Sequence, residues 1–310
     1  MTGRLVALTG ATGFIGRHLL RELPKRGYRI RVILRRPSAV PPEASSAVVG
    51  DLARPQNMSA ALAGVDAVIH SAGIAHAMSG VPEDDYRVLN TEATIGLARA
   101  AERAGAKRFV FLSSIRAQSG PVANGILTEE HEPRPTDAYG QSKLAAEQGL
   151  ARLGLDWVAL RPVLVYGPGV KGNMAALLRL AGSPYPLPLA GLTGKRSLLA
   201  LDNLVTAIDA VLAAPASLRR PLIVADPEPL TVAAMIVAMR AGLGRGPGLF
   251  PAPRAIMEAA CRALGRAQAF ERLAGSLVAS PSALQALGWV PSVETRAGLA
   301  ALARSPASEP

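Results

Sequence analysis

The chain has 310 residues, of which 49% are hydrophobic and 18% are charged. These proportions exclude a disordered protein, and the length allows one large domain or a nucleotide-binding domain with a smaller cap. The single cysteine, Cys261, excludes an internal disulfide, and the sequence shows neither a signal peptide nor an uncharged apolar run of about 18 residues. We therefore expect a soluble, cytoplasmic protein with no membrane partner.

The net charge of +11 raises the question of a nucleic-acid partner. Arginine carries most of this charge, because the only lysines are Lys25, Lys107, Lys143, Lys171 and Lys195. The arginines are scattered and aromatic residues make up 4% of the chain, so no basic stripe is interleaved with stacking rings. We expect no nucleic acid, since a phosphorylated small ligand explains the positive bias better. His70, His76 and His131 are too scattered for a metal site, so we also expect no metal.

Short apolar runs alternate with helical patterns over the first half of the chain. The run 5–9 predicts a strand that leads through a glycine-rich turn into a helix, which continues through 18–23 and ends at Pro24 and Gly27. Further strands are predicted at 30–34, 67–69, 109–112 and 157–160, and further helices at 59–62, 91–104 and 142–153. This alternation predicts an α/β fold, a Rossmann-type doubly wound parallel sheet with helices on both faces.

After residue 161, clusters of Pro and Gly interrupt the chain at 166–169 and at 183–188. We predict that 1–162 form the NAD(P)-binding domain and that 163–195 and 221–304 form a smaller C-terminal α/β cap that binds substrate. Residues 196–220 return to the first domain through a helix at 202–213, and 305–310 form a disordered tail. The amphipathic segment 254–273 is interpreted as a core-facing helix of the cap rather than a membrane contact.

Three glycines, Gly10, Gly13 and Gly16, follow the first predicted strand and open the first predicted helix. In this setting the backbone can approach a pyrophosphate closely, and the N–H groups of the helix start, at Phe14 and Ile15, can bind its charge. The spacing Gly-x-x-Gly-x-x-Gly therefore predicts a dinucleotide site.

The end of the second predicted strand bears on the choice of cofactor. An acidic residue there would hydrogen-bond a free ribose 2′-hydroxyl, whereas this chain has Leu34 followed by Arg35 and Arg36. Arginine pairs with a 2′-phosphate in a bidentate way, so we favour NADP over NAD. Further cofactor contacts are expected from Asp51 with Leu52 and from the backbone at Ala72 and Gly73.

Tyr139 and Lys143 are four residues apart in a predicted helix and therefore share one face. A free tyrosine titrates near about 10, and a nearby ammonium lowers its pKa toward the working range. The pair alone is a weak signal, but Ser113 and Ser114 end a predicted strand at the sheet edge where ligands bind. A hydroxyl in that place can bind the same carbonyl oxygen as the tyrosine.

Together these motifs resemble the extended short-chain dehydrogenase/reductase family, the NAD-dependent epimerase/dehydratase group, over most of the chain. The resemblance implies that Tyr139 is the acid/base, that Lys143 holds the nicotinamide ribose, and that Ser114 lies against the reacting oxygen. It implies further cofactor contacts from Asn90, Ser113, Pro162 and Val165, and substrate contacts from Arg116, Asn173, Arg196 and Arg272. It also implies a nucleotide-sugar substrate, UDP-linked in this branch, and a homodimer of the kind usual in the family.

The stretch 161–173 separates subgroups of the family. UDP-galactose 4-epimerases usually carry an asparagine where this chain has Leu164, and dehydratases carry an added acid/base pair where it has Ile115 and Arg116. The stretch is most similar to the UDP-N-acetylquinovosamine dehydrogenases, which act on UDP-4-keto-6-deoxy-N-acetylhexosamine. We therefore expect an NAD(P)-dependent oxidoreductase that interconverts a 4-keto and a 4-hydroxy UDP-sugar. The alternatives are a UDP-sugar 4-epimerase with tightly held NAD and a non-catalytic, cofactor-sensing protein of the same fold.

Overall fold

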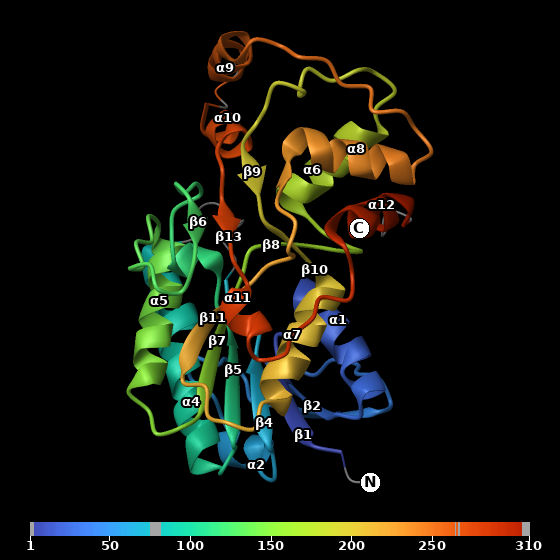
Figure 1. Ribbon diagram of the computed structural model, residues 1–310. Helices are drawn as coiled ribbons and strands as arrows, with labels where there is room; N and C mark the ends of the chain where they lie inside the picture. Colours follow the sequence, from blue (N-terminus) through green and yellow to red (C-terminus); the bar gives the residue numbers. More distant parts are fainter. Residues whose placement is uncertain (1–2, 75–81, 264, 266, 306–310) are drawn as a thin grey trace.

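The computed structural model describes residues 3–74, 82–263, 265 and 267–305, although not the side chains of 260, 267–269 and 272. Its centre is a seven-stranded sheet in the order β11-β7-β5-β4-β1-β2-β3, in which all neighbouring strands are parallel (Figure 1). The strands are β1 (Leu5–Thr9), β2 (Arg29–Leu34), β3 (Ala44–Val48), β4 (Ala67–His70), β5 (Arg108–Leu112), β7 (Trp157–Pro162) and β11 (Arg220–Val224). The strand order reverses between β1 and β4, which places a ligand crevice at their carboxyl ends. The predicted fold class is therefore confirmed.

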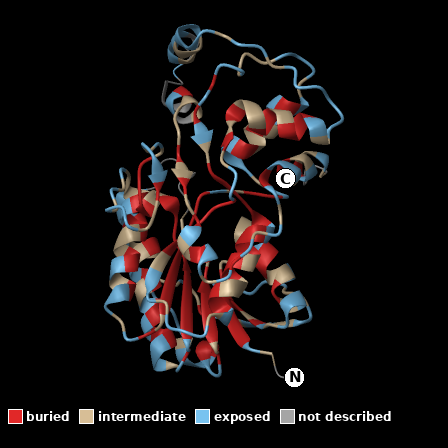
Figure 2. Ribbon diagram, in the orientation of Figure 1, coloured by how far each residue is buried: buried red, intermediate tan, exposed pale blue. Residues whose placement is uncertain are grey.

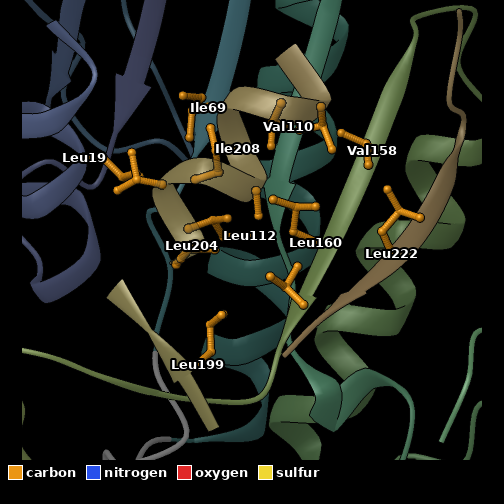
Figure 3. Close-up of a cluster of buried hydrophobic side chains, with 14 of the residues drawn as sticks. Leu19, Ile69, Val110, Leu112, Val158, Leu160, Leu199, Leu204, Ile208 and Leu222 are labelled. Atoms are coloured by element: carbon orange, nitrogen blue, oxygen red, sulfur yellow. The ribbon is translucent and has the colours of Figure 1, made fainter. Parts of the chain in front are cut away.

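Helices cover both faces of this sheet, because successive side chains of each buried strand point into two separate apolar layers. On one face, α1 (Phe14–Glu22) and α7 (Leu201–Ala213) contribute Leu19 and Ile208 to an apolar cluster that also contains Val158 of the sheet (Figure 3). On the other face lie α2 (Met58–Leu62), α4 (Ala93–Arg103) and α5 (Ala138–Ala151), where Leu97 packs with Phe109. The shorter turns of this part are η1 (Pro24–Arg26), α3 (Glu83–Tyr86), the π-helix η2 (Arg87–Glu92) and the 3-10 helix η3 (Ile115–Ala117).

Two edge strands of the sheet, β3 and β11, are absent from the predicted strands, although β11 contains the buried apolar run 222–224. β3 reads Ala-Ser-Ser-Ala-Val, and none of its five residues is buried. β11 starts with an exposed Arg220, and the N–H of Ile223 in this edge strand donates to Glu129 Oε1 at 2.6 Å. Because β11 belongs to the main sheet, the predicted end of the returning segment at residue 220 is too early.

The cap lies over the carboxyl ends of the strands (Figure 1). Its own apolar cluster joins α6 (Gly172–Gly182), α8 (Val232–Gly242) and α12 (Thr295–Arg304). Three small sheets link the layers: β8 (Leu164–Tyr166) with β10 (Leu198–Ala200), β9 (Lys195–Arg196) with β12 (Leu230–Thr231), and β6 (Ile126–Leu127) with β13 (Val278–Ala279). Leu277, Leu284 from α11 (Ser282–Gln285) and Trp289 join the apolar cluster of the sheet. The chain beyond residue 221 therefore contributes to both layers, and the division into two domains otherwise stays a prediction.

The segment 254–273 forms two helices at the tip of the cap, α9 (Arg254–Ala263) and α10 (Ala267–Ala274). Phe270 is 3% exposed, whereas Ile256 is 65% exposed, and Figure 2 shows that α9 is largely accessible. Only the second helix therefore anchors a large side chain in the way that the amphipathic pattern predicts. Among the described residues, no helix is long and apolar enough to span a bilayer.

Candidate active site

The predicted site residues gather at the carboxyl-terminal edge of the sheet, beneath the cap. The glycine turn follows β1, Gly73 lies in the loop after β4, Ser114 follows β5, and Pro162 ends β7. The carboxyl ends of parallel strands meet at one edge, so residues from distant parts of the chain share one crevice.

The turn after β1 has no room for a side chain at its last glycine. The N–H of Gly13 donates to the carbonyl of Gly10 at 2.9 Å, and Gly10 has a φ of +71°. A Cβ on Gly16 would lie 2.0 Å from the Gly10 carbonyl oxygen. Gly13 caps α1 without a side chain, which leaves the first N–H groups of the helix, at Phe14 and Ile15, able to bind an anion. This backbone fits the pyrophosphate of a dinucleotide.

A buried amide fixes the loop after β4. Asn90 Oδ1 accepts the N–H of Ile74 at 2.8 Å, and its Nδ2 donates to the Ile74 carbonyl and to Ser142 Oγ, both at 3.2 Å. A Cβ on Gly73 would lie 2.7 Å from Asn90 Oδ1 and 3.5 Å from Lys143 Nζ. Gly73 therefore lets this loop approach α5 closely. Asn90 lies in the π-helix η2, a rare turn that is frequent at functional sites, and its own cofactor contact stays a prediction.

His70, the last residue of β4, ties this strand to β1 and α4, which the sequence did not indicate. Its Nδ1 lies 2.7 Å from Thr9 Oγ1 and its Nε2 lies 2.9 Å from Thr94 Oγ1. Thr9 Oγ1 also accepts the N–H of Ala72 at 3.2 Å. Burial lowers the pKa of His70 to about 3, so the ring is neutral at pH 7. Across the described residues no group of three or more His, Cys, Asp and Glu could hold a metal, and His76 lies outside them.

Ser114, Tyr139 and Lys143 come together where β5 ends and α5 begins. The Tyr139 hydroxyl shares a hydrogen bond with Ser114. Lys143 is 5% exposed and donates to the carbonyl of Leu112 at 2.9 Å. Its Nζ lies 6.0 Å from the centre of the Tyr139 ring and 4.6 Å from that of Phe111. The structure thus unites the three side chains that the sequence predicts to be catalytic.

Burial dominates the acid–base properties of these groups. It raises the pKa of Tyr139, although the hydrogen bond with Ser114 opposes the increase. It lowers the pKa of Lys143 to about 8, against the opposing effect of the Glu147 charge. The predicted decrease of the Tyr139 pKa is therefore wrong in direction, because desolvation of the phenolate outweighs the stabilisation by its neighbours.

The polar residues on either side of Ser114 have partners within the protein. The Ser113 hydroxyl donates to the buried carboxylate of Glu147 and so faces the interior. Arg116 pairs with Asp137, whose carboxylate caps α5. The Nε and Nη1 atoms of Arg116 are buried and have no hydrogen-bond partner within the described part of the chain. A cofactor contact of Ser113 and a substrate contact of Arg116 stay predictions.

The residues predicted to bind the adenosine end of the cofactor lie near the surface. Arg35 and Arg36 lie exposed in the bend after β2, and an exposed Asp51 with a half-buried Leu52 lies beyond the end of β3. Arg17 of α1 lines a hollow together with the end of β2, and no motif pointed to it.

Of the predicted nicotinamide contacts, Pro162 is the last residue of β7 and Val165 is the middle residue of the short strand β8 that follows, and their cofactor contacts stay predictions. Leu164 is 42% exposed. The structure therefore puts an accessible apolar side chain at the position where the resemblance made an asparagine decisive.

The cap residues predicted to bind a diphosphate are less closely assembled. Arg196 of β9 donates to the carbonyl of Pro121 at 2.8 and 3.3 Å, which links the cap to the loop that follows β5. Asn173 is exposed in the first turn of α6. Arg272 belongs to α10, and its side chain lies outside the described residues.

Known proteins with similar sequence and structure agree with this architecture. Residues 6–225 match the model of the NAD dependent epimerase/dehydratase family. The chain is 33% identical to a UDP-glucose 4-epimerase of Vibrio cholerae, over 92% of this chain and 90% of that protein. It is 32% identical to a 3-diazoavenalumate denitrifying reductase of a Streptomyces species, over 93% of this chain and 96% of that protein. The structure of MoeE5 in complex with UDP-glucuronic acid and NAD is 29% identical, with a TM-score of 0.74 over 96% of this chain and 97% of its own. With its motifs, its fold and these relatives in agreement, the chain belongs to the NAD-dependent epimerase/dehydratase family.

Proposed function

We propose that this protein is an NAD-dependent UDP-sugar 4-epimerase. The observation that carries the proposal is the hydrogen-bonded pair of Ser114 and Tyr139 beside the buried Lys143. These side chains occur in a chain that is 33% identical, over 92% of its length, to a UDP-glucose 4-epimerase. The similarity to MoeE5, whose structure contains UDP-glucuronic acid and NAD, supports a nucleotide sugar as the substrate.

Epimerisation at C4 requires one protein group that removes the proton of the 4-hydroxyl and returns it later. The Tyr139 oxygen takes this role, and the Ser114 hydroxyl hydrogen-bonds the same sugar oxygen while its charge changes. The charged form of Lys143 favours the phenolate of Tyr139. The ammonium donates one hydrogen bond to Leu112, and its remaining donors can hold a ribose. The glycine turn would hold NAD, which would supply the acceptor for the C4 hydride and then its donor.

Turnover without added cofactor tests this proposal. We expect the purified protein to carry NAD and to convert UDP-glucose or UDP-N-acetylglucosamine into its 4-epimer with no NAD(P)H supplied. Tyr139→Phe should lower kcat by about 10²- to 10⁴-fold and leave the bound NAD in place, because the hydroxyl alone is removed. Unchanged turnover in Tyr139→Phe would contradict the acid/base role, whereas a cofactor-bound protein that turns over no UDP-sugar would favour the non-catalytic, cofactor-sensing alternative.

One residue favours a second function. Leu164 is 42% exposed at the position where UDP-galactose 4-epimerases usually carry an asparagine, and a leucine side chain donates no hydrogen bond to a diphosphate. An oxidoreductase that interconverts a 4-keto and a 4-hydroxy UDP-sugar would use the same three catalytic side chains but exchange its cofactor in each cycle. This function predicts no turnover of UDP-hexoses alone, and NAD(P)H oxidation when a 4-keto UDP-sugar is added.

The cofactor preference is a separate proposal. MoeE5 holds NAD, whereas in this chain Arg35 and Arg36 lie exposed after β2 and no carboxylate stands at Leu34 to bind a free 2′-hydroxyl. We propose that the site accepts NADP(H) as well as NAD, with Arg35 pairing with the 2′-phosphate.

A further inference from the structure

A buried ion pair that the proposed chemistry does not use lies directly behind Ser114 and Lys143. Glu147 of α5 and Arg161 of β7 have side chains that are only 4% and 3% exposed. Arg161 Nε donates to Glu147 Oε1 at 3.1 Å, and its Nη2 pairs with Glu147 Oε2. Two charges removed from water to this extent are costly unless their geometry and remaining hydrogen bonds are satisfied.

The pair is embedded in a network that reaches the catalytic strand end. The Ser113 hydroxyl donates to Glu147, and Arg161 Nη1 donates to Gln118, whose amide donates to the carbonyl of His131 at 2.6 Å. The N–H of Ser113 also donates to the carbonyl of Leu160, just before Arg161, at 2.8 Å. Ser113 is therefore held from both its main chain and its side chain.

The network determines where the neighbouring serine lies. Ser114 follows in an extended conformation, with φ −161° and ψ 153°, and successive extended residues point to opposite sides. When Glu147 holds the Ser113 hydroxyl in the interior, the Ser114 hydroxyl is turned toward Tyr139.

The same carboxylate lies one helical turn beyond Lys143. Burial lowers the pKa of Lys143, and the carboxylate of Glu147 raises it. His70 of β4 is neutral and adds no charge. Two further groups lie near Lys143. The centre of the Tyr139 ring is 6.0 Å from Lys143 Nζ, and the guanidinium of Arg161 in β7 pairs with Glu147. A neutral side chain at 147 would leave the ammonium beside the uncompensated guanidinium of Arg161.

We propose that Glu147 and Arg161 form a positioning pair that keeps Lys143 charged and holds Ser114 in register with Tyr139. The inference rests on the proposed function, in which Ser114, Tyr139 and Lys143 are catalytic. Neither Glu147 nor Arg161 contacts substrate in this account, so both act through the residues that do.

The titration of Lys143 tests the proposal without substrate or turnover. The chain has only five lysines, and the other four are exposed, so ¹⁵N-lysine NMR can follow the Lys143 Nζ signal as the one titrating near pH 8. In Glu147→Gln we expect the midpoint to fall by about one pH unit or more. The alkaline limb of kcat/KM should move down by the same amount, and Glu147→Asp, which keeps a carboxylate on a shorter side chain, should lower both by a smaller amount.

A second buried ion pair at the opposite end of the same strands provides the control. Asp156 Oδ2 accepts from Arg108 Nε at 2.8 Å, and their side chains are 16% and 10% exposed. Asp156→Asn breaks an equivalent arginine–carboxylate pair at the amino ends of β5 and β7. We expect it to lower the melting temperature as Glu147→Gln does, while the Lys143 titration and the pH profile stay as in the unsubstituted protein.

Two results would overturn the proposal: a folded Glu147→Gln protein with an unchanged Lys143 midpoint, or the same shift in Asp156→Asn. If Glu147→Gln does not fold, Glu147→Asp decides between the outcomes, because its shorter side chain withdraws the charge and should lower the midpoint by a smaller amount. An unchanged midpoint there would equally contradict the proposal. Since the NMR titration needs no substrate, its outcome is independent of whether the protein is an epimerase.

Discussion

At the scale of single residues, desolvation sets the chemistry of the site. Burial disfavours the charged forms of both Tyr139 and Lys143, so the pKa of the phenol rises and that of the ammonium falls to about 8. Lys143 is still mostly charged at pH 7. Its charge can therefore favour the phenolate, which is the form of Tyr139 that accepts a proton. The site then depends on the groups that keep Lys143 protonated.

The contribution of Arg35 to NADPH binding can be tested at the scale of a single residue. We expect Arg35→Asp to weaken NADPH binding by about ten- to a hundredfold, because a charge-assisted pair with the 2′-phosphate contributes about 1.5–3 kcal/mol. NADH binding should change little, and calorimetric titration of both cofactors measures the difference. Arg29→Asp is a matched control, since Arg29 is also exposed but lies at the opposite end of β2. Equal losses for NADPH and NADH would show that Arg35 does not meet the 2′-phosphate.

At the scale of elements, the turn from β1 into α1 depends on a glycine that has no room for a side chain. A Cβ on Gly16 would lie 2.0 Å from the Gly10 carbonyl oxygen, which is backbone and cannot rotate away. We expect Gly16→Ala to destabilise the protein by about 1–3 kcal/mol and to abolish NAD binding, because the turn must open. Thermal unfolding and the NAD content of the purified protein provide the measurements.

Gly96 in α4 is the control, because alanine there should stabilise the protein, whereas alanine at Gly16 should destabilise it. A Cβ there has open space around it, and alanine is favoured over glycine in a helix by up to about 1 kcal/mol. Gly96→Ala should raise the melting temperature and leave NAD in place. A Gly16→Ala protein that retains NAD would contradict the account of the turn.

The elements that the sequence predicts are those whose signal is local. β1, β5 and β7 are buried at every residue, so their apolar runs identify them. The edge strand β3 has no buried residue and contains two serines, so no pattern separates it from a loop, whereas the buried apolar run 222–224 of β11 is a local signal that the prediction missed. The Glu147–Arg161 pair and the Thr9–His70–Thr94 bridge join elements that are distant in the chain. Only the fold shows that such side chains meet, which is why the motifs predict the catalytic residues but not what positions them.

At the scale of the whole molecule, His70 couples stability to pH. Its pKa is lowered from 6.5 to about 3, so between these values the unfolded chain binds a proton that the folded chain does not. The free energy of unfolding should therefore decrease as the pH falls from about 6.5 toward 3, by up to about 1.4 kcal/mol per pH unit. His70→Gln removes this contribution, and urea unfolding at pH 7 and pH 5 compares the two proteins. Equal changes with pH in both would contradict the burial of a neutral imidazole.

The junction between the sheet and the cap is a property of the whole chain. β13 of the C-terminal region pairs with β6, and Arg196 of the cap reaches Pro121 in the loop after β5. The motifs of the sheet side were predictable from spacing. The cap residues have no comparable pattern, so Asn173, Arg196 and Arg272 remain predictions about the substrate.

The most direct test of the central claim uses UDP-glucose that carries deuterium at C4, incubated with the purified protein and no added cofactor. An epimerase returns the same hydride that it removes, so we predict UDP-galactose that retains the deuterium at C4. Tyr139→Phe should form this product at least about a hundredfold more slowly. A protein that leaves UDP-glucose unchanged, and instead oxidises NAD(P)H when a 4-keto UDP-sugar is supplied, would contradict the epimerase assignment.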